Sequence, residues 1–372
     1  MRVKSAAAIS WLISAVLFAA GFALAGRPVE TPAQACGMPP NPPVRMDAIE
    51  ITIMAKADHR DCWQVQMAVA AAPLVTGYTL GIRTLPLLMN DDPAVEARTA
   101  AVTLGRAADI LQITDGELKD FANMGMLAPL DACVSAHAEF ANVRQDAWLA
   151  ATVRGQVWGV PVAADTDTLF FSKTLLRRMG WSEARIGDLP QQILEGAFTR
   201  DDMRRTAEDA VRRGIVRPGF GVWEDQDRAW DVKTPRRDAR ISARVLFWYW
   251  NNRAWGEDLL KLGGPDKFEW LYNNMGYALP PADKADAKPA SLRAASYKVF
   301  YVITADKANG NRGHQKEACA LLAKMTTPEI NDRHIAHGGY LSVMTPKAQT
   351  LPEARFGYDI MRMIDGTYGQ RK

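Results

Sequence analysis

The stretch of sequence that decides the fold is residues 155–181, which read GQVWGVPVAADTDTLFFSKTLLRRMGW. The pattern predicts a turn, a strand over residues 157–162, an apolar strand over residues 169–171, and a helix that stops at Gly180. Between the strands lies an acidic and hydroxyl-rich patch, made of Asp165, Thr166, Asp167 and Thr168. Residues two apart on an extended chain face the same way, so Asp165 and Asp167 are suited to hydrogen-bond one polyol.

Upstream of this stretch, predicted strands and helices alternate. Strands are expected over residues 49–53, 79–85 and 109–114, each followed by a segment with helical spacing of its apolar residues. This order predicts a parallel α/β sheet, whose ligand crevice lies beyond the carboxyl ends of the strands. The loops after the first and third strands therefore supply candidate ligand contacts at Asp58, His59 and Asp115. Two alternatives stay open: Asp115 as a helix N-cap and His59 as an exposed loop residue.

Downstream, aromatic residues gather between positions 223 and 255. A tryptophan face can stack on a sugar ring, and aromatic walls with a few polar groups are typical of small-ligand sites. The candidate contacts here are Trp223, Trp248 and Trp250. The alternative is core packing, because Leu246, Phe247 and Trp250 fall at helical spacing. The arginines of this half are interleaved with acids, which predicts a solvated mixed-charge face, and Thr199 with Asp202 predicts a helix cap.

Three parts of the chain resemble the family 1 extracellular solute-binding proteins, the receptors that deliver sugars and other small solutes to ATP-binding cassette importers. Gly155, Gly159 and Pro161 match the motif that precedes the family's first crossover between lobes. Residues 108–131 resemble its strand, helix and turn, and residues 316–343 resemble its closing helices, although Ser342 replaces the usual proline. The resemblance covers residues 46–345, but the segment between Trp250 and Tyr297 is shorter than in most members.

The resemblance implies an α/β, two-lobe periplasmic-binding-protein fold (type II-like), in which each lobe is a mostly parallel sheet flanked by helices. It implies a first lobe of residues 46–162 plus 299–338 and a second of residues 163–298 plus 339–372, joined by hinge crossovers. The ligand contacts it implies lie in the interlobe cleft at Asp165, Thr166, Asp167 and Tyr340. It further implies a monomeric receptor that works with a membrane permease and needs no cofactor.

The first 45 residues predict export. Arg2 and Lys4 precede an apolar stretch that ends in Ala23-Leu24-Ala25, which is typical of a cleaved signal peptide over residues 1–25. An uncleaved membrane anchor is the alternative, since about 20 apolar residues can span a bilayer. Residues 26–45 are a proline-rich linker. Export to the periplasm allows the four cysteines to pair, but the sequence leaves the three connectivities open, and buried thiols remain an alternative.

Composition and motifs narrow the function class. The net charge of +3 over 372 residues does not favour a nucleic-acid partner. The sequence holds no G-x-S-x-G, H-E-x-x-H or G-x-x-x-x-G-K motif, and His334 and His337 are expected to be surface residues and not metal ligands. We therefore predict no catalytic residue and no metal. A secreted carbohydrate-active enzyme or periplasmic accessory protein using the same cleft remains the alternative, with Asp165 and Asp167 as the paired carboxylates.

Overall fold

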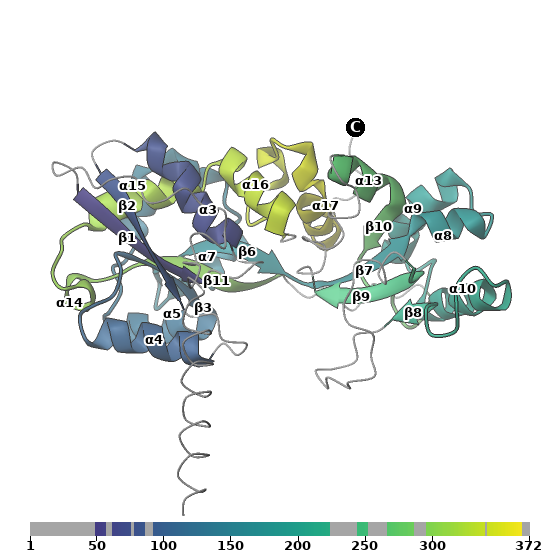
Figure 1. Ribbon diagram of the computed structural model, residues 1–372, viewed down its shortest axis with the longest axis horizontal. Helices are drawn as coiled ribbons and strands as arrows, with labels where there is room; N and C mark the ends of the chain where they lie inside the picture. Colours follow the sequence, from purple (N-terminus) through teal and green to yellow (C-terminus); the bar gives the residue numbers. More distant parts are fainter. Residues whose placement is uncertain are drawn as a thin grey trace, which may run out of the picture.

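The computed structural model describes residues 49–56, 62–75, 78–85, 92–223, 244–251, 266–285, 295–338 and 341–366. These residues form two lobes that lie side by side, each built around one β-sheet (Figure 1). The predicted signal peptide and linker lie outside the described residues. Within the described ranges, no helix is long and apolar enough to cross a membrane.

The first lobe contains a five-stranded sheet in the order β2-β1-β3-β11-β6. Its strands are β1 (Ile49–Lys56), β2 (Tyr78–Leu85), β3 (Ile110–Thr114), β6 (Val160–Asp165) and β11 (Ser296–Ile303). β1 pairs in parallel with β2 and β3, whereas β11 runs antiparallel to both of its neighbours. The helices of this lobe include α3 (Cys62–Ala71), α4 (Asp92–Thr103), α5 (Asp115–Asn123), α15 (Gln315–Met325) and α16 (Pro328–Gly338).

The second lobe contains a four-stranded sheet in the order β10-β7-β9-β8. Its strands are β7 (Asp167–Ser172), β8 (Val222–Trp223), β9 (Phe247–Asn251) and β10 (Met275–Ala278). β7 runs antiparallel to β9 and β10, and β8 is parallel to β9. The helices around it are α8 (Lys173–Arg178), α9 (Glu183–Leu194), α10 (Arg200–Arg212), α13 (Lys267–Asn274) and α17 (Arg355–Ile364). In each sheet one strand therefore runs opposite to all the others: β11 in the first sheet and β7 in the second.

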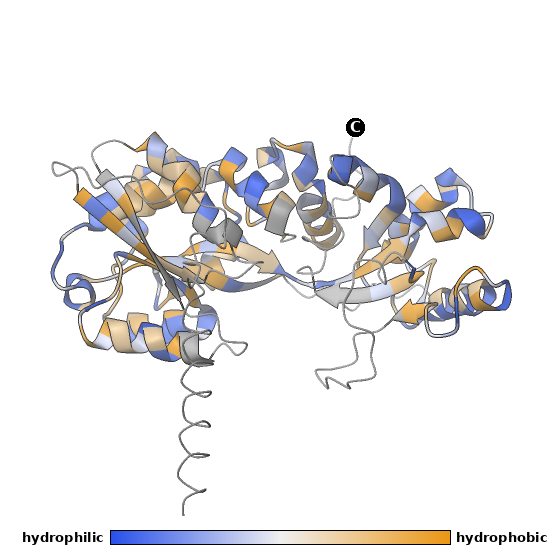
Figure 2. Cartoon of the chain, in the orientation of Figure 1, coloured by the Kyte–Doolittle hydropathy of each residue, from blue (hydrophilic) through white to orange (hydrophobic). Residues whose placement is uncertain are grey.

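Strand pairing locates the passages between lobes. β6 pairs with β11 as far as Asp165, opposite Ser296, and β7 begins at Asp167 in the other sheet. We therefore place the first crossing at Thr166, a few residues after the division expected at residues 162 and 163. The apolar run from Val162 to Ala164 is buried because it continues the first sheet. Figure 2 shows the same two strands as hydrophobic on both sides of a hydrophilic junction.

Two expectations about single segments are wrong. The helical spacing of Leu246, Phe247 and Trp250 does not form a helix, because Phe247–Asn251 is strand β9. Aromatic residues favour strands, and β9 fills the gap between β7 and β8. His334 is not a surface residue: it is 1% exposed, because its face of α16 packs toward α3.

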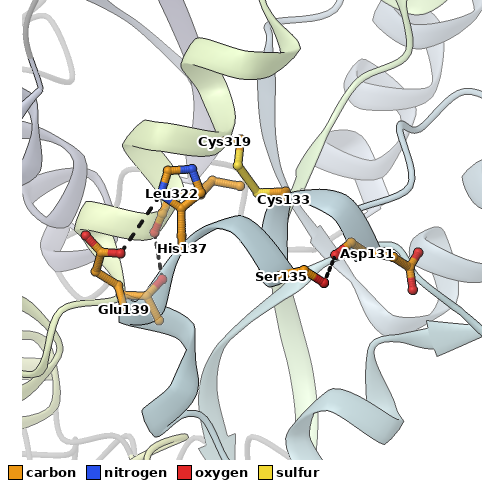
Figure 3. The surroundings of a disulfide bond; sticks show 8 residues. Asp131, Cys133, Ser135, His137, Glu139, Cys319 and Leu322 are labelled. Carbon is orange, nitrogen blue, oxygen red and sulfur yellow. Dashed lines mark hydrogen bonds and ion pairs between the residues drawn. A yellow bond between two sulfur atoms is a disulfide. The ribbon is translucent and has the colours of Figure 1, made fainter.

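One disulfide joins two helices of the first lobe. Cys133, in α6 (Asp131–Ala136), is bonded to Cys319 in α15, with 5.9 Å between their Cα atoms (Figure 3). This selects one pairing among those that the sequence left open. Cys36 lies outside the described residues.

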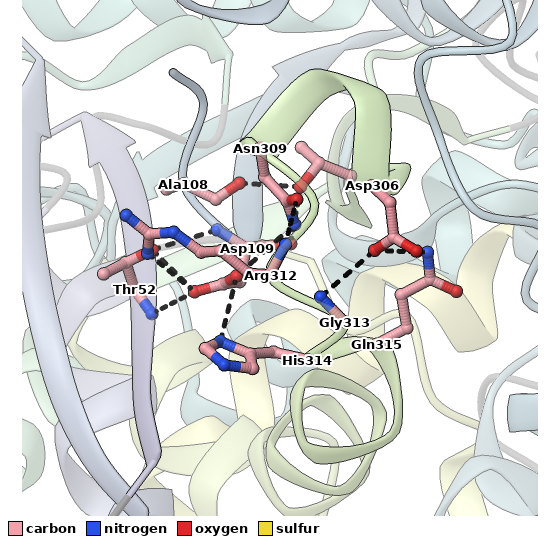
Figure 4. A network of polar contacts seen from close by, with 10 residues as sticks. Thr52, Ala108, Asp109, Asp306, Asn309, Arg312, Gly313, His314 and Gln315 are labelled. Carbon is pink, nitrogen blue, oxygen red and sulfur yellow. Dashed lines mark hydrogen bonds and ion pairs between the residues drawn. The ribbon is translucent and has the colours of Figure 1, made fainter. Parts of the chain in front are cut away.

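A buried carboxylate, that of Asp109, is the centre of a polar network at the amino end of β3 in the first lobe. Asp109 is 1% exposed and accepts hydrogen bonds from the backbone N–H and the hydroxyl of Thr52, at 2.8 and 2.7 Å. Arg312 and His314, which follow α14 (Asp306–Asn309), approach the same carboxylate at 3.4 Å (Figure 4). Because Asp109 immediately precedes β3, this network lies at the amino end of that strand, and we assign it a structural role.

Candidate functional site

The carboxyl edges of the two sheets face each other across Thr166. In the first sheet β1, β3 and β6 run in one direction, so Lys56, Thr114 and Asp165 end them on one edge. In the second sheet β8, β9 and β10 all oppose β7, so their carboxyl ends point toward the edge where β7 begins, and β9 ends beside its first residue, Asp167. The chain passes directly from one edge to the other (Figure 1). Such edges are where open α/β sheets bind ligands.

The predicted polar patch occupies this junction. Asp165 and Thr166 are half-buried, and Asp167 is exposed. Thr168 is fully buried, so the accessible part of the patch is residues 165–167. A third segment braces the junction, because Ala164 exchanges two backbone hydrogen bonds with Leu341, at 3.1 and 3.3 Å. Carboxylate and hydroxyl groups at a braced junction can accept and donate hydrogen bonds to a polar ligand.

Asp115 lies on the same edge but does not cap its helix. The N-cap of α5 is Thr114, whose hydroxyl accepts from Glu117 N–H while the Glu117 carboxylate accepts from Thr114 N–H at 2.8 Å. Asp115 is the first residue of the helix, and its side chain is exposed. Because β11 lies between β3 and β6, Asp115 is separated from the junction by two strand spacings, about 10 Å. That span suits two contacts to one small ligand.

A buried ion pair fixes the helix that carries Asp115. Arg98 of α4 donates to both carboxylate oxygens of Glu117, at 2.5 and 2.7 Å, and both side chains are about 6% exposed. Glu117 thus links α4, α5 and the end of β3. The sequence Thr114-x-x-Glu117 is typical of a capping box and could have identified Glu117, but the prediction considered only Asp115 as the cap.

Among the aromatic candidates, the structure describes the side chain of Trp248 and the backbone pairing of Trp223 and Trp250. Trp248 is 1% exposed and stacks on Phe170 of β7, with 5.5 Å between ring centroids, so it takes the core role that was the alternative. The backbone of Trp223 pairs with Trp248, and that of Trp250 pairs with Thr168. Asn251, which sequence reasoning missed, pairs with Asp167 at the carboxyl end of β9. Asp58, His59 and Tyr340 lie outside the described residues.

Neither histidines nor acids form a metal site in the described part of the chain. No group of three or more His, Cys, Asp or Glu is placed there to hold an ion. The buried His334 lines a hollow of about 450 Å³, together with Met67 of α3, Ile330 of α16 and Phe268 of α13. This hollow contains helix faces of both lobes and no strand end.

Comparison with known proteins supports the fold and assigns no sequence family. No protein-family profile and no curated protein matches this sequence. The structure is similar to the sugar-binding protein MalE of Xanthomonas citri, with a TM-score of 0.56 and 16% identity over 85% of this chain and 84% of that one. It is similar to maltose-bound MalE3 of T. maritima, with a TM-score of 0.57 and 14% identity over 86% of each chain.

A third similar structure is an ABC transporter solute-binding protein of Agrobacterium vitis with bound D-mannitol. Its TM-score is 0.55, with 14% identity over 86% of this chain and 84% of that chain. The chain therefore has the two-lobe α/β fold of these solute-binding proteins, as the sequence predicted.

Proposed function

We propose that the protein is a family 1 type solute receptor that binds a carbohydrate or polyol between its lobes and delivers it to the permease of an ATP-binding cassette importer. The observation that carries this proposal is the meeting of both carboxyl sheet edges at the polar junction of residues 165–167. Proteins that share this fold over most of their length are described as binding sugar, maltose and D-mannitol. Polyhydroxylated solutes match a junction of carboxylates and hydroxyls.

Each candidate contact has a distinct role in this proposal. Asp165 and Asp167 accept hydrogen bonds from solute hydroxyls, Thr166 donates or accepts one, and Asp115 reaches the solute from the first turn of α5. Trp223 and Trp250 remain candidates for stacking, and Asp58, His59 and Tyr340 remain candidates on the sequence argument alone. Closure of the two lobes about the crossing at Thr166 then encloses the solute by hinge motion.

The cellular setting follows from the predicted signal peptide. Export places a monomeric receptor in the periplasm, where it requires no cofactor and meets the permease at the membrane. The resemblance to solute-binding proteins and the apolar stretch before residue 26 support this setting.

Calorimetric titration with maltose, D-mannitol and a panel of other mono- and oligosaccharides tests the function. Saturable binding without chemical change is expected. Cleavage of any glycan in the panel, followed by product analysis, would instead establish the carbohydrate-active enzyme. Absence of binding to every sugar and polyol would remove the carbohydrate assignment.

Replacing Asp165 with Ala tests the junction itself. Loss of a hydrogen bond to a charged group is expected to weaken solute binding by about 1.5–3 kcal/mol. Asp188→Ala is the matched control, because Asp188 is an exposed acid of α9, outside the junction. Equal affinity of the Asp165→Ala variant and the wild type would exclude Asp165 as a contact.

A further inference from the structure

Helix α17 is attached firmly to the second lobe. The Phe356 ring packs against Phe170 of β7 and Tyr277 of β10, with centroid separations of 5.6 and 5.1 Å. The Tyr277 hydroxyl also donates to Asp359, at 2.9 Å. These side chains are at most 7% exposed. These close-packed contacts attach one face of α17 to the second sheet, while α16 of the first lobe packs against the same helix.

The end of the same helix is tied to the first lobe. Asp365, directly after α17, accepts two hydrogen bonds from Arg144, at 2.6 and 2.8 Å. Arg144 precedes α7 (Gln145–Ala150) and is held on the first lobe by Asp146, at 3.0 Å, and by the Tyr297 hydroxyl of β11, at 3.3 Å. The guanidinium side chain is 11% exposed and that of Asp365 is 26% exposed. The contact is therefore a partly buried, bidentate ion pair between lobes.

Charge is maintained on Arg144 and on Asp146, its carboxylate partner in the first lobe. The hydrogen bond to Asp365 keeps the pKa of Arg144 above its ordinary value, although burial opposes it. Burial raises the pKa of Asp146, but hydrogen bonds from Arg144 and Tyr297 outweigh that effect and leave the pKa lowered. Arg144 thus keeps one carboxylate partner in its own lobe even if Asp365 is lost.

A second polar tie lies beside the first. The Tyr358 hydroxyl of α17 donates to Asp332 of α16, at 2.6 Å, and both residues are fully buried. Asp332 also accepts from the backbone N–H groups of Thr350 and Leu351, at 2.6 and 2.8 Å. Since α16 packs against α3, this bond too joins α17 to the first lobe.

Both ties lie across the crossing from β3, β8 and β9, whose carboxyl ends form part of the proposed ligand edges. In Figure 1, α16, α17 and β10 lie above the crossing strands, whereas β3, β8 and β9 lie below them. The sheet orders agree: β6 and β10 are the edge strands on one side, and β3 and β9 lie toward the other. Closing the lower side about a pivot at Thr166 must separate the groups on the upper side.

We propose that the Arg144–Asp365 ion pair is an interlobe latch that opposes closure of the lobes and so weakens solute binding. The inference rests on the proposed receptor function for its effect on affinity, but the latch itself is testable without any solute. Lowering the cost of closure raises the population of the binding-competent state and hence the apparent affinity.

Asp365→Asn is the decisive variant, because the Asp365 carboxylate accepts both of its hydrogen bonds from Arg144. Spin labels on p-acetylphenylalanine at Lys119 of α5 and Glu208 of α10, both exposed, report the lower side of the crossing. Double electron–electron resonance is expected to show a shorter-distance population in the solute-free variant. With maltose or D-mannitol as the probe, affinity is expected to rise about five-fold.

Two controls separate the latch from general effects of charge removal. Glu183→Gln removes a bidentate ion pair with Arg177 that lies wholly within the second lobe, and it is expected to leave the distances unchanged. Asp365→Glu keeps the charge and should stay close to the wild type. Unchanged or longer distances in Asp365→Asn would overturn the latch. If the distances shorten but no sugar or polyol of the panel binds, the latch stands and the carbohydrate assignment fails.

Discussion

At Gly276, in strand β10, the second lobe leaves no room for a side chain. A Cβ atom there would lie 2.1 Å from ring atoms of Phe171, which is itself 1% exposed on the neighbouring strand β7. Gly276→Ala is expected to lower the free energy of unfolding by about 1–3 kcal/mol, because the buried ring has no room to retreat. Urea denaturation followed by circular dichroism measures the change.

Gly187 provides the matched control. It lies exposed within α9, and a Cβ atom there would meet nothing within 4 Å. Gly187→Ala is expected to raise the free energy of unfolding by about 0.5–1 kcal/mol, since alanine loses less backbone entropy in a helix. Equal destabilisation by both substitutions would argue that strand β10 does not pack on Phe171 as described.

Candidate site residues could be predicted from the sequence where neighbouring residues alone reveal them. Asp165, Thr166 and Asp167 form a polar run between two apolar segments, and such a contrast is visible in the sequence. The burial of Trp248 is not visible, because its ring partner Phe170 belongs to a distant segment. The same limit applies to His334, whose burial depends on how α16 meets α3. Sequence periodicity describes a face of an element but does not say what covers it.

At the scale of elements, the cap of α10 was predicted correctly, whereas the cap of α5 and the aromatic strand β9 were not. The predicted capping box of α10 is present: the Thr199 hydroxyl accepts from Asp202 N–H, and the Asp202 carboxylate accepts from Thr199 N–H at 2.9 Å. A capping box needs only neighbours in sequence. The apolar residues around strand β9 fall at helical spacing, so a helix was expected there. Only the pairing of β9 with β7 and β8 shows that the segment is a strand. Competition between helix and strand was settled by tertiary contacts.

Removing the cap of α10 should destabilise the protein in a pH-dependent way. Thr199→Ala is expected to cost about 1 kcal/mol at neutral pH. The hydrogen bond from Thr199 lowers the pKa of Asp202 below the ordinary value of 3.8. The stabilisation that the ionised Asp202 carboxylate provides is therefore complete above that value and is lost as the pH falls through the lowered pKa. The difference in free energy of unfolding between the wild type and the Thr199→Ala variant should thus become smaller in acid.

Urea unfolding between neutral pH and about pH 3 measures this gap. Thr206→Ala is the control in the same helix, because the Thr206 hydroxyl only donates to the Asp202 backbone carbonyl, at 2.7 Å. Alanine favours helix, so that change should be nearly neutral. A gap for Thr199→Ala that stays constant down to acid would contradict the role of Asp202.

At the scale of the whole molecule, the two-lobe plan was predictable, whereas the strand order was not. Alternating strands and helices before residue 125 indicate a parallel sheet, and the pattern at residues 155–181 indicates a passage between lobes. The insertion of β11 between β3 and β6 joins segments about 130–190 residues apart, as the pairing of Ser296–Ile303 shows. Such long-range pairing is a property of the folded chain that no local pattern encodes.

The disulfide also joins segments that are distant in the sequence, but by a covalent bond. It joins Cys133 to Cys319 across a sequence separation of 186 residues, so the closed loop contains the whole second sheet. Replacing both cysteines with Ala is expected to lower the free energy of unfolding by about 2–5 kcal/mol, mainly because the unfolded chain gains freedom. Thermal unfolding of the oxidised wild type and of the double variant measures the loss. The wild type in reductant should approach the variant, and a variant as stable as the oxidised wild type would show that the bond does not stabilise the first lobe.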